Sequence, residues 1–209
     1  VRNGGIFNLD FLFSPECYAY SPFDYMAYKD SQQIFEITAT NLLTGKADVF
    51  RKTDTEGQEE AIKASASMPL LSSIRVVNHQ PYLDGGIADS IPFKRAQELG
   101  YEKLVIVLTR DITYRKAENS RAMNRLVRMK YRDFPQFVSA FESRPRRYNE
   151  SLEEIERLER EGKAFVIRPQ QPVTVSRVER DNNKLMDLYH QGTAVIESQM
   201  ADLRAFLKN

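Results

Sequence analysis

Tyr82-Leu83-Asp84-Gly85-Gly86-Ile87 follows an extended segment and precedes a helical pattern, so these residues set the order of the expected elements around them. Ser90 can cap that helix, and Pro92 is typical of a first helical turn. Gly100 is expected to end the helix, and the apolar run 104–108 then predicts a buried strand. The order strand, turn, helix and strand predicts one βαβ unit of a parallel sheet.

Asp84 is expected at the carboxyl end of its strand, where open α/β sheets place their ligands and their chemistry. Gly85 and Gly86 allow backbone conformations that are closed to other residues, so the acid can be held in a fixed direction. The same three residues also fit a tight turn with an Asx-type side chain and no chemical role. The surrounding sequence therefore has to separate the two interpretations.

A segment of small residues, 64–69, ends in Ser67-Met68-Pro69, and Pro81 then leads into the Asp-Gly-Gly turn. From about residue 34 to residue 108 this arrangement resembles the second half of the patatin-like phospholipase domain. The resemblance implies an α/β fold, a partial three-layer patatin-like sheet with helices on both faces that is truncated at the N-terminus. It also implies that Asp84 is the general base of a Ser-Asp dyad, with Gly85 and Gly86 as the backbone of the motif.

The nucleophile of this family lies in a Gly-x-Ser-x-Gly elbow, and the 209 residues contain no such motif. The early glycine pair in Asn3-Gly4-Gly5 is too short to match the family's oxyanion loop. We therefore expect the nucleophile and the oxyanion hole upstream of Val1, in a longer bacterial protein of which this is a C-terminal portion. The resemblance predicts a serine lipid acyl hydrolase, and it predicts that this chain alone is inactive.

The resemblance divides the chain into residues 1–118, half of a catalytic domain, and residues 119–209, a mainly helical region with one or two further strands. A basic amphipathic helix is expected at 119–132. The cluster Arg144-Pro145-Arg146-Arg147 is expected to neutralise a charged helix that begins with a capping box at Ser151. Two helices, at 182–191 and 193–208, are expected to close the chain.

Other side chains offer alternatives to the Ser-Asp dyad. Ser65 and Ser67 lack the glycines of a nucleophile elbow, so they are interpreted as packing or hydrogen-bonding residues. His79 stands just before the motif, and a Ser-His-Asp triad would use it as the base, whereas the resemblance predicts no histidine. A phosphate-binding Rossmann domain is weakly supported, because no Gly-x-Gly-x-x-Gly follows any expected strand.

The segment 4–28 is rich in aromatic residues, which we expect to pack mainly in the core. These residues are Phe7, Phe11, Phe13, Tyr18, Tyr20, Phe23, Tyr25 and Tyr28. In a lipid hydrolase the same rings would instead flank the entrance for the acyl chain.

Composition excludes several classes of protein. The formal net charge is +1, which gives no bulk attraction to nucleic acid. One cysteine cannot form an internal disulfide, and with only two histidines no metal or other cofactor is expected.

A cytoplasmic location is expected, with peripheral membrane contact through the basic helix as an option. The expected partners are a lipid or ester substrate and, through surface exposed by truncation, a second copy. The competing function is a catalytically inert assembly or lipid-contact module.

Overall fold

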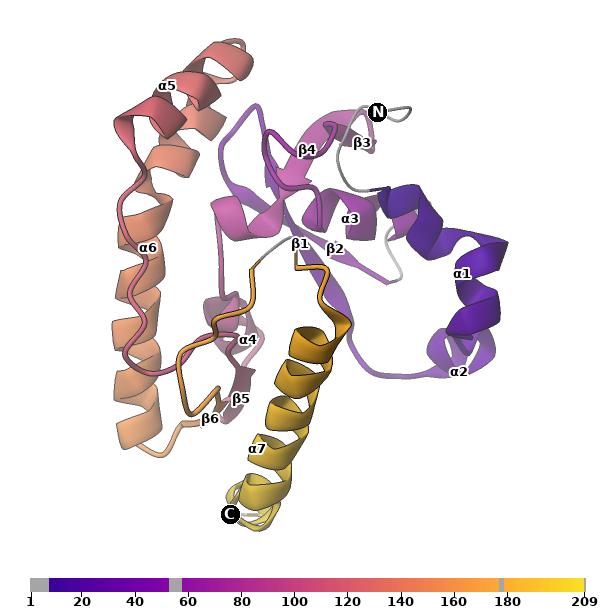
Figure 1. Ribbon diagram of the computed structural model, residues 1–209, viewed down its shortest axis with the longest axis vertical. Coiled ribbons are helices and arrows are strands. Elements are labelled where there is room, and N and C mark those ends of the chain that lie inside the picture. Colours follow the sequence, from indigo (N-terminus) through magenta and orange to yellow (C-terminus); the bar gives the residue numbers. More distant parts are fainter. Residues whose placement is uncertain (1–7, 53–57, 177–178, 209) are drawn as a thin grey trace. The chain divides into compact units, whose positions relative to one another are not determined.

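The chain is seen in a computed structural model that describes residues 8–52, 58–176 and 179–208. It is a mixed α/β protein, and its internal contacts divide it into two compact units (Figure 1). The first unit takes the residues up to Ile91 together with Glu118–Tyr148, and the second takes Pro92–Ala117 and the residues from Asn149 onward. The boundary expected after residue 118 separates part of a catalytic domain from a C-terminal region, and it stays a prediction. Phe7 and the Asn3-Gly4-Gly5 segment lie outside the described residues.

The first unit is built on a four-stranded antiparallel sheet with the order β2-β1-β4-β3. Its strands are β1 (Glu36–Asn41), β2 (Ala47–Arg51), β3 (Arg75–Val77) and β4 (Gln80–Asp84). Residues 34–40 and 47–50 have the composition of strands joined by a turn at Gly45, which predicts a hairpin. This hairpin is confirmed as β1 and β2, with Gly45 at a positive φ of 67° in the turn. β4 is an inner strand, and its last residue, Asp84, stands opposite Ala39 of β1.

The expected βαβ unit is wrong in its pairing. The helix α4 (Phe93–Glu98) and the strand β5 (Leu104–Val107) follow β4 as predicted, but β5 pairs in parallel with β6 (Ala164–Ile167) in a separate sheet. The physical reason is that β1 and β3 already occupy both edges of β4, so no edge remains for β5. The expected helix cap is also wrong, because the Ser90 hydroxyl donates to the carbonyl of Gly86, at 2.6 Å, instead of capping α4.

The two faces of the four-stranded sheet have separate hydrophobic cores. On one face, the helix α3 (Gln58–Ser65) presents Ala61 and Ala64, both fully buried, to a cluster that includes Tyr82. On the other face, Leu83 packs in a cluster with residues of α5 (Arg121–Lys130) and α6 (Pro135–Arg160). Neighbouring residues of a strand point to opposite faces, so β4 contributes to both cores just before Asp84.

The helix α6 continues through Pro145, so the separate helix expected from Ser151 is wrong. Proline has no N–H for the carbonyl four residues earlier, here that of Phe141. The side-chain amide of Asn119 donates to that carbonyl at 3.2 Å, and Arg147 donates to the neighbouring carbonyl of Ala140 at 2.8 Å. The acceptor that Pro145 frees, the Phe141 carbonyl, is therefore satisfied by a side chain, and the helix does not need to end.

The second unit contains the β5–β6 sheet, α4 and the long helix α7 (Asn182–Lys208). α7 is one helix through Gly192, so the two helices expected at 182–191 and 193–208 are wrong as separate elements. β5 was expected to be buried throughout, but its burial alternates. Val105 and Val107 are 43% and 69% exposed.

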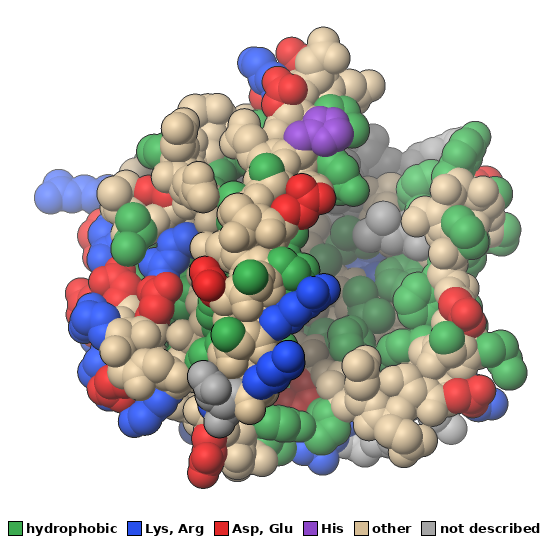
Figure 2. Space-filling view, turned by 90° about the horizontal axis from the view of Figure 1, so that it is seen from below, with side chains coloured by type: hydrophobic (Ala, Val, Ile, Leu, Met, Phe, Trp, Pro, Cys, Tyr) green, Lys and Arg blue, Asp and Glu red, His purple; other side chains and the backbone are tan. Residues whose placement is uncertain are grey.

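The N-terminal part of the first unit has three short helices, η1 (Leu9–Phe13), α1 (Pro15–Tyr20) and α2 (Tyr25–Asp30). The expected burial of its aromatic rings is wrong for Phe11, Tyr20, Phe23 and Tyr25, which are all exposed. Figure 2 shows hydrophobic side chains, in green, at the surface of the part at the right, where these helices lie. In the described parts of the chain, no helix has both the length and the apolar character needed to cross a bilayer.

Candidate functional site

The Asp84 carboxylate is held at the tip of β4 by its own turn. Asp84 is half-buried, and its Oδ1 accepts a hydrogen bond of 2.7 Å from the backbone N–H of Gly86. This bond caps the 3₁₀ turn η2 (Gly85–Ile87), because an acceptor at the cap position satisfies an N–H that has no partner inside the turn. The carboxylate is thus fixed in direction while it remains an acceptor.

Gly85 is required for space rather than for an unusual backbone conformation. Neither Gly85 nor Gly86 has a positive φ, so the expected conformational role of the two glycines is wrong. A Cβ on Gly85 would lie 2.0 Å from the carbonyl oxygen of Thr38 on β1, a distance that no side chain can occupy. The absence of a side chain therefore lets the turn lie directly against the neighbouring strand.

Gly86 leaves room for two charged groups. A Cβ at this position would lie 3.0 Å from Asp84 Oδ1 and 3.2 Å from Arg144 Nη2. The guanidinium of Arg144, on α6, therefore lies close to the Asp84 carboxylate across Gly86. Such an arginine supplies positive charge near the candidate base.

Thr40 fixes the turn from the side of β1. This residue is fully buried, and its hydroxyl donates to the Asp84 carbonyl at 2.7 Å. The same oxygen accepts a hydrogen bond of 3.1 Å from the N–H of Ala88. One side chain thus joins the start and the end of the Asp-Gly-Gly turn.

Arg147 fixes the turn from the side of α6. Its Nη2 donates to the carbonyl of Ile87 at 2.7 Å and to that of Ala140 at 2.8 Å. Arg147 therefore links α6 to the candidate site, a contact that the expected neutralising role of the arginine cluster does not include. The sequence did not indicate that Thr40 and Arg147 belong to the site. For Arg147, the available signal was a proline next to arginines within an otherwise helical pattern.

The two serines upstream of the motif make no elbow. Ser67 is fully buried, its hydroxyl donates to the carbonyl of Lys63 at 2.7 Å, and its expected hydrogen-bonding role is confirmed. Its carbonyl accepts from the Asp84 N–H at 2.8 Å, so the end of the small-residue segment meets the end of β4. Ser65 is the last residue of α3.

His79 lies at the opposite end of β4 from Asp84. Asn78 and His79 form the two-residue turn between β3 and β4, with φ values of 48° and 62°. Asp84 is five positions after His79 along an extended strand, so the two residues lie roughly 16 Å apart at 3.3 Å per residue. The Ser-His-Asp triad is therefore wrong for this pair of residues.

A buried polar network lies two residues before the candidate base. The hydroxyl of Tyr82 donates to Asp48 at 2.8 Å, and the side-chain amide of Asn41 donates to the same carboxylate oxygen at 3.0 Å. Burial, and then the hydrogen bond to Asp48, raise the pKa of Tyr82 to about 12. The neutral phenol therefore stabilises the sheet beside the site.

Arg110 follows the apolar run 104–108, and the sequence leaves two roles open for it: steering an anionic head group, or a salt bridge to Asp111 or a neighbour. The residue belongs to the second unit. Its guanidinium donates to the carbonyl of Val173 at 3.2 Å and stacks on the ring of Tyr114. The hydrogen bond from the Thr113 side chain is the main cause that lowers the pKa of Asp111.

An aromatic cavity of about 740 Å³ lies in the first unit, beside α1, α2 and α3. Phe23, Tyr25 and Tyr28 line it, while Asp84 does not. Gln58 also lines it and accepts a hydrogen bond from Tyr28, and its Nε2 is buried with no hydrogen-bond partner within the described chain. Among the described residues, no group of three histidine, cysteine or acidic side chains is placed to hold a metal ion.

Comparison with known proteins gives one partial match. Residues 134–208 match a family described as Domain of unknown function (DUF6363). The matched region contains α6, β6 and α7, and the description assigns it no activity. No curated protein matches the chain.

Proposed function

We propose that the chain is part of a serine lipid acyl hydrolase of the patatin-like phospholipase type, with Asp84 as the general base. The observation that carries the proposal is the fixed carboxylate at the tip of an inner strand, held by the Gly86 N–H. The contact between Ser67 and Asp84 supports it, because it joins the Ser-x-Pro segment to the Asp-Gly-Gly turn. In this proposal the sheet of the first unit is part of a three-layer fold with helices on both faces.

The proposed reaction needs a serine from polypeptide outside these 209 residues, since the sequence has no Gly-x-Ser-x-Gly. Asp84 accepts the proton of that serine as its oxygen attacks the ester carbonyl of a lipid. The proton then passes to the leaving alkoxide, and an acyl-enzyme remains. Water attacks this ester with Asp84 again as the base, which releases the fatty acid and the free serine.

The test is Asp84→Asn in the longer protein that supplies the serine. We expect turnover of a lipid ester to fall at least ~100-fold, as is typical of a lost general base. Asparagine keeps an acceptor for the Gly86 N–H, so the thermal unfolding midpoint should change little. Asp89→Asn makes the same change of charge five residues away and should retain turnover. Retained turnover in Asp84→Asn would overturn the assignment.

A second experiment addresses this chain alone. A serine-directed fluorophosphonate probe is expected to label the longer protein and to leave the 209-residue chain unlabelled. Labelling of this chain at Ser65 or Ser67 would contradict the proposal, because it would place a reactive serine within these residues.

The exposed surface of α5 favours a second candidate, a module that contacts lipid without catalysis. Met123, Leu126 and Met129 are 40%, 48% and 64% exposed, beside the exposed Arg121 and Arg125. An apolar strip next to basic side chains is the pattern of helices that lie at an anionic membrane surface. In this candidate function, the protein is cytoplasmic and lies at a membrane surface. Alternatively, the module assembles with a second copy of the chain through its exposed aromatic residues.

Sedimentation with vesicles tests the second candidate. We expect the chain to bind vesicles of phosphatidylcholine with phosphatidylglycerol, and the double change Arg121→Glu and Arg125→Glu to remove most of this binding. Lys184→Glu with Lys208→Glu is the matched control on α7. Equal loss in both variants would point to net charge rather than to α5.

A further inference from the structure

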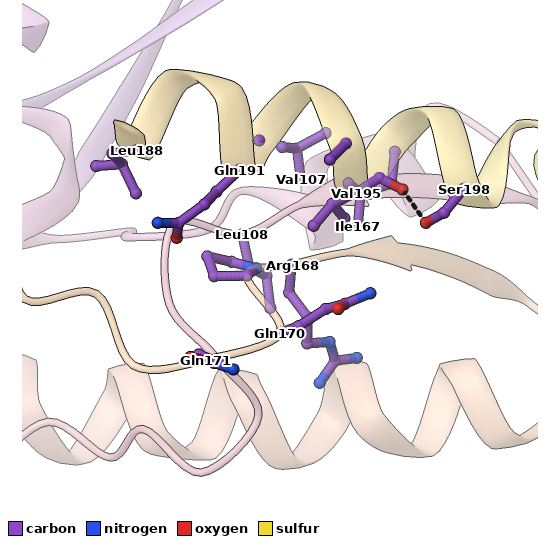
Figure 3. Close-up of a pocket in the computed structure, with 13 residues that line it drawn as sticks. Val107, Leu108, Ile167, Arg168, Gln170, Gln171, Leu188, Gln191, Val195 and Ser198 are labelled. Atoms are coloured by element: carbon purple, nitrogen blue, oxygen red, sulfur yellow. Dashed lines mark hydrogen bonds between the residues drawn. The ribbon is translucent and has the colours of Figure 1, made fainter. Parts of the chain in front are cut away.

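The second unit has a cavity of about 590 Å³ that the proposed hydrolase does not use. It lies where β5 and β6 end, and α7 covers it (Figure 3). The carboxyl ends of parallel strands are where α/β sheets most often bind ligands. The volume falls within the roughly 300–1,000 Å³ of small-molecule sites.

The floor and the roof of this cavity, which we call the α7 cavity, are apolar. Val107, Leu108 and Ile167 come from the strand ends, and Leu188 and Val195 come from α7. Val107 is 69% exposed, so the protein itself leaves most of this side chain uncovered. An apolar body of a ligand would remove this surface from water, which is favourable.

Three glutamine side chains supply the polar groups. Gln170 and Gln171 lie on the segment after β6, and Gln191 lies on α7. Figure 3 shows Gln191 directed from α7 toward the cavity, with Gln170 and Gln171 on the side away from α7. Within the described parts of the chain, none of these three amides hydrogen-bonds to another residue. Each amide has N–H donors and a carbonyl acceptor, so the three together fit a ligand edge that both donates and accepts hydrogen bonds.

The α7 cavity offers no uncompensated charge. Arg168 is the charged residue that lines it, and its guanidinium pairs with Glu159 on α6. An anionic ligand would therefore have to compete with a carboxylate that is already in place. This arrangement favours an uncharged ligand.

Gly192 leaves part of the space beside α7 unfilled. The residue stands within the 27-residue helix α7, where glycine is unfavourable compared with alanine. Its φ is not positive, and a Cβ built on it would meet no atom within 4 Å. Neither backbone conformation nor close packing requires glycine here, and the residue lines the cavity. Its missing side chain keeps that space open.

We propose that the α7 cavity binds an uncharged small molecule with an apolar body and an amide-like edge that both donates and accepts hydrogen bonds. The apolar body lies on Val107, Leu108 and Ile167, and the edge pairs with the glutamine amides. This site is separate from the chemistry assigned to Asp84. It gives a binding role to a cavity formed partly by the region whose matched family has no assigned function.

Octanamide is the probe for this site, because it joins an apolar chain to a primary amide. In ¹H–¹⁵N spectra of the 209-residue chain, we expect its addition to shift the side-chain amide signals of Gln170 and Gln191. Octanoate has the same chain but carries a charge, and we expect it to bind at least about tenfold more weakly. Equal affinity for both compounds would overturn the assignment of an uncharged ligand.

Gly192→Leu places a side chain in the cavity and should weaken octanamide binding at least about tenfold. Because a Cβ at this position meets no atom within 4 Å and leucine favours helix, the variant should unfold at a temperature no lower than that of the parent. Ala201→Leu adds the same side chain at an exposed position of α7 and should leave binding unchanged. Unchanged affinity in Gly192→Leu, or shifts confined to residues outside the cavity, would overturn the proposal.

Discussion

The turn 84–88 and the α7 cavity both contain glycine, yet they differ in whether their polar groups form hydrogen bonds within the protein. In the turn, the Asp84 carboxylate and the carbonyl of Ile87 have protein partners, and Thr40 joins its two ends. In the α7 cavity, three glutamine amides have no partner within the described chain. The difference separates a region whose geometry the fold fixes from a region whose groups remain available to a ligand.

Gly85→Ala should have the largest effect on the stability of the turn 84–88. The new Cβ would lie 2.0 Å from the Thr38 carbonyl oxygen, which is backbone and has little freedom to move. We expect a loss of about 3 kcal/mol or more in the free energy of unfolding, measured with urea. Gly86→Ala is the matched control, because its Cβ would lie no closer than 3.0 Å to the nearest side-chain atoms, and it should cost about 1 kcal/mol. Equal losses would contradict the role given to Gly85.

Arg147→Met tests the link between α6 and the turn. It removes the Arg147 hydrogen bonds to the carbonyls of Ile87 and Ala140, and we expect a loss of about 2 kcal/mol in stability. Arg125→Met removes an exposed arginine of α5 and should change stability by less than about 0.5 kcal/mol. Urea titration of both variants separates the specific contact from the loss of positive charge.

The buried network beside the site predicts a loss of stability in alkali. The pKa of Tyr82 is raised from its usual 10 to about 12, so its contribution is fully present below pH 10 and is lost as the pH rises toward 12. The full loss is about 3 kcal/mol. Tyr82→Phe should remove this part of the pH dependence and lower stability at pH 7 by about 1 kcal/mol. Tyr20→Phe, at an 88% exposed ring, should leave the pH profile unchanged.

Gly192→Ala gives the smallest effect, and its sign is opposite to that of Gly85→Ala. Alanine is the better helix former and its Cβ meets no atom here, so we expect a gain of about 0.5–1 kcal/mol in the free energy of unfolding. A loss of stability would show that the space beside Gly192 is filled, and it would remove the contrast between the two glycines.

Local patterns predicted most elements correctly, because they depend on neighbouring residues. The β1–β2 hairpin and the helix end at Gly100 lie where the sequence indicates. The small-residue pattern at 59–67 likewise predicts the helix α3, and the apolar run 164–167 predicts the strand β6. The pairing of β4 with β1 and β3 could not be found in this way, because alternation does not reveal which edges are already occupied.

The continuity of α6 was hidden for a different reason. Pro145 is a strong local signal for a helix end, but the donor that compensates for it is Asn119, 26 positions earlier in the chain. In the candidate site, the sequence indicates Asp84 through its motif. It does not indicate Thr40 or Arg147, whose roles depend on contacts between distant segments.

The two-residue turn at Asn78 and His79 offers a practical site for attaching a reporter. Both residues are exposed at the end of the β3–β4 hairpin, and exposed loop tips tolerate insertion better than strands. A fluorophore attached there would sit on the strand that ends at Asp84, yet at the opposite end from the carboxylate. It would report on the order of that strand without touching the group that is proposed to accept a proton.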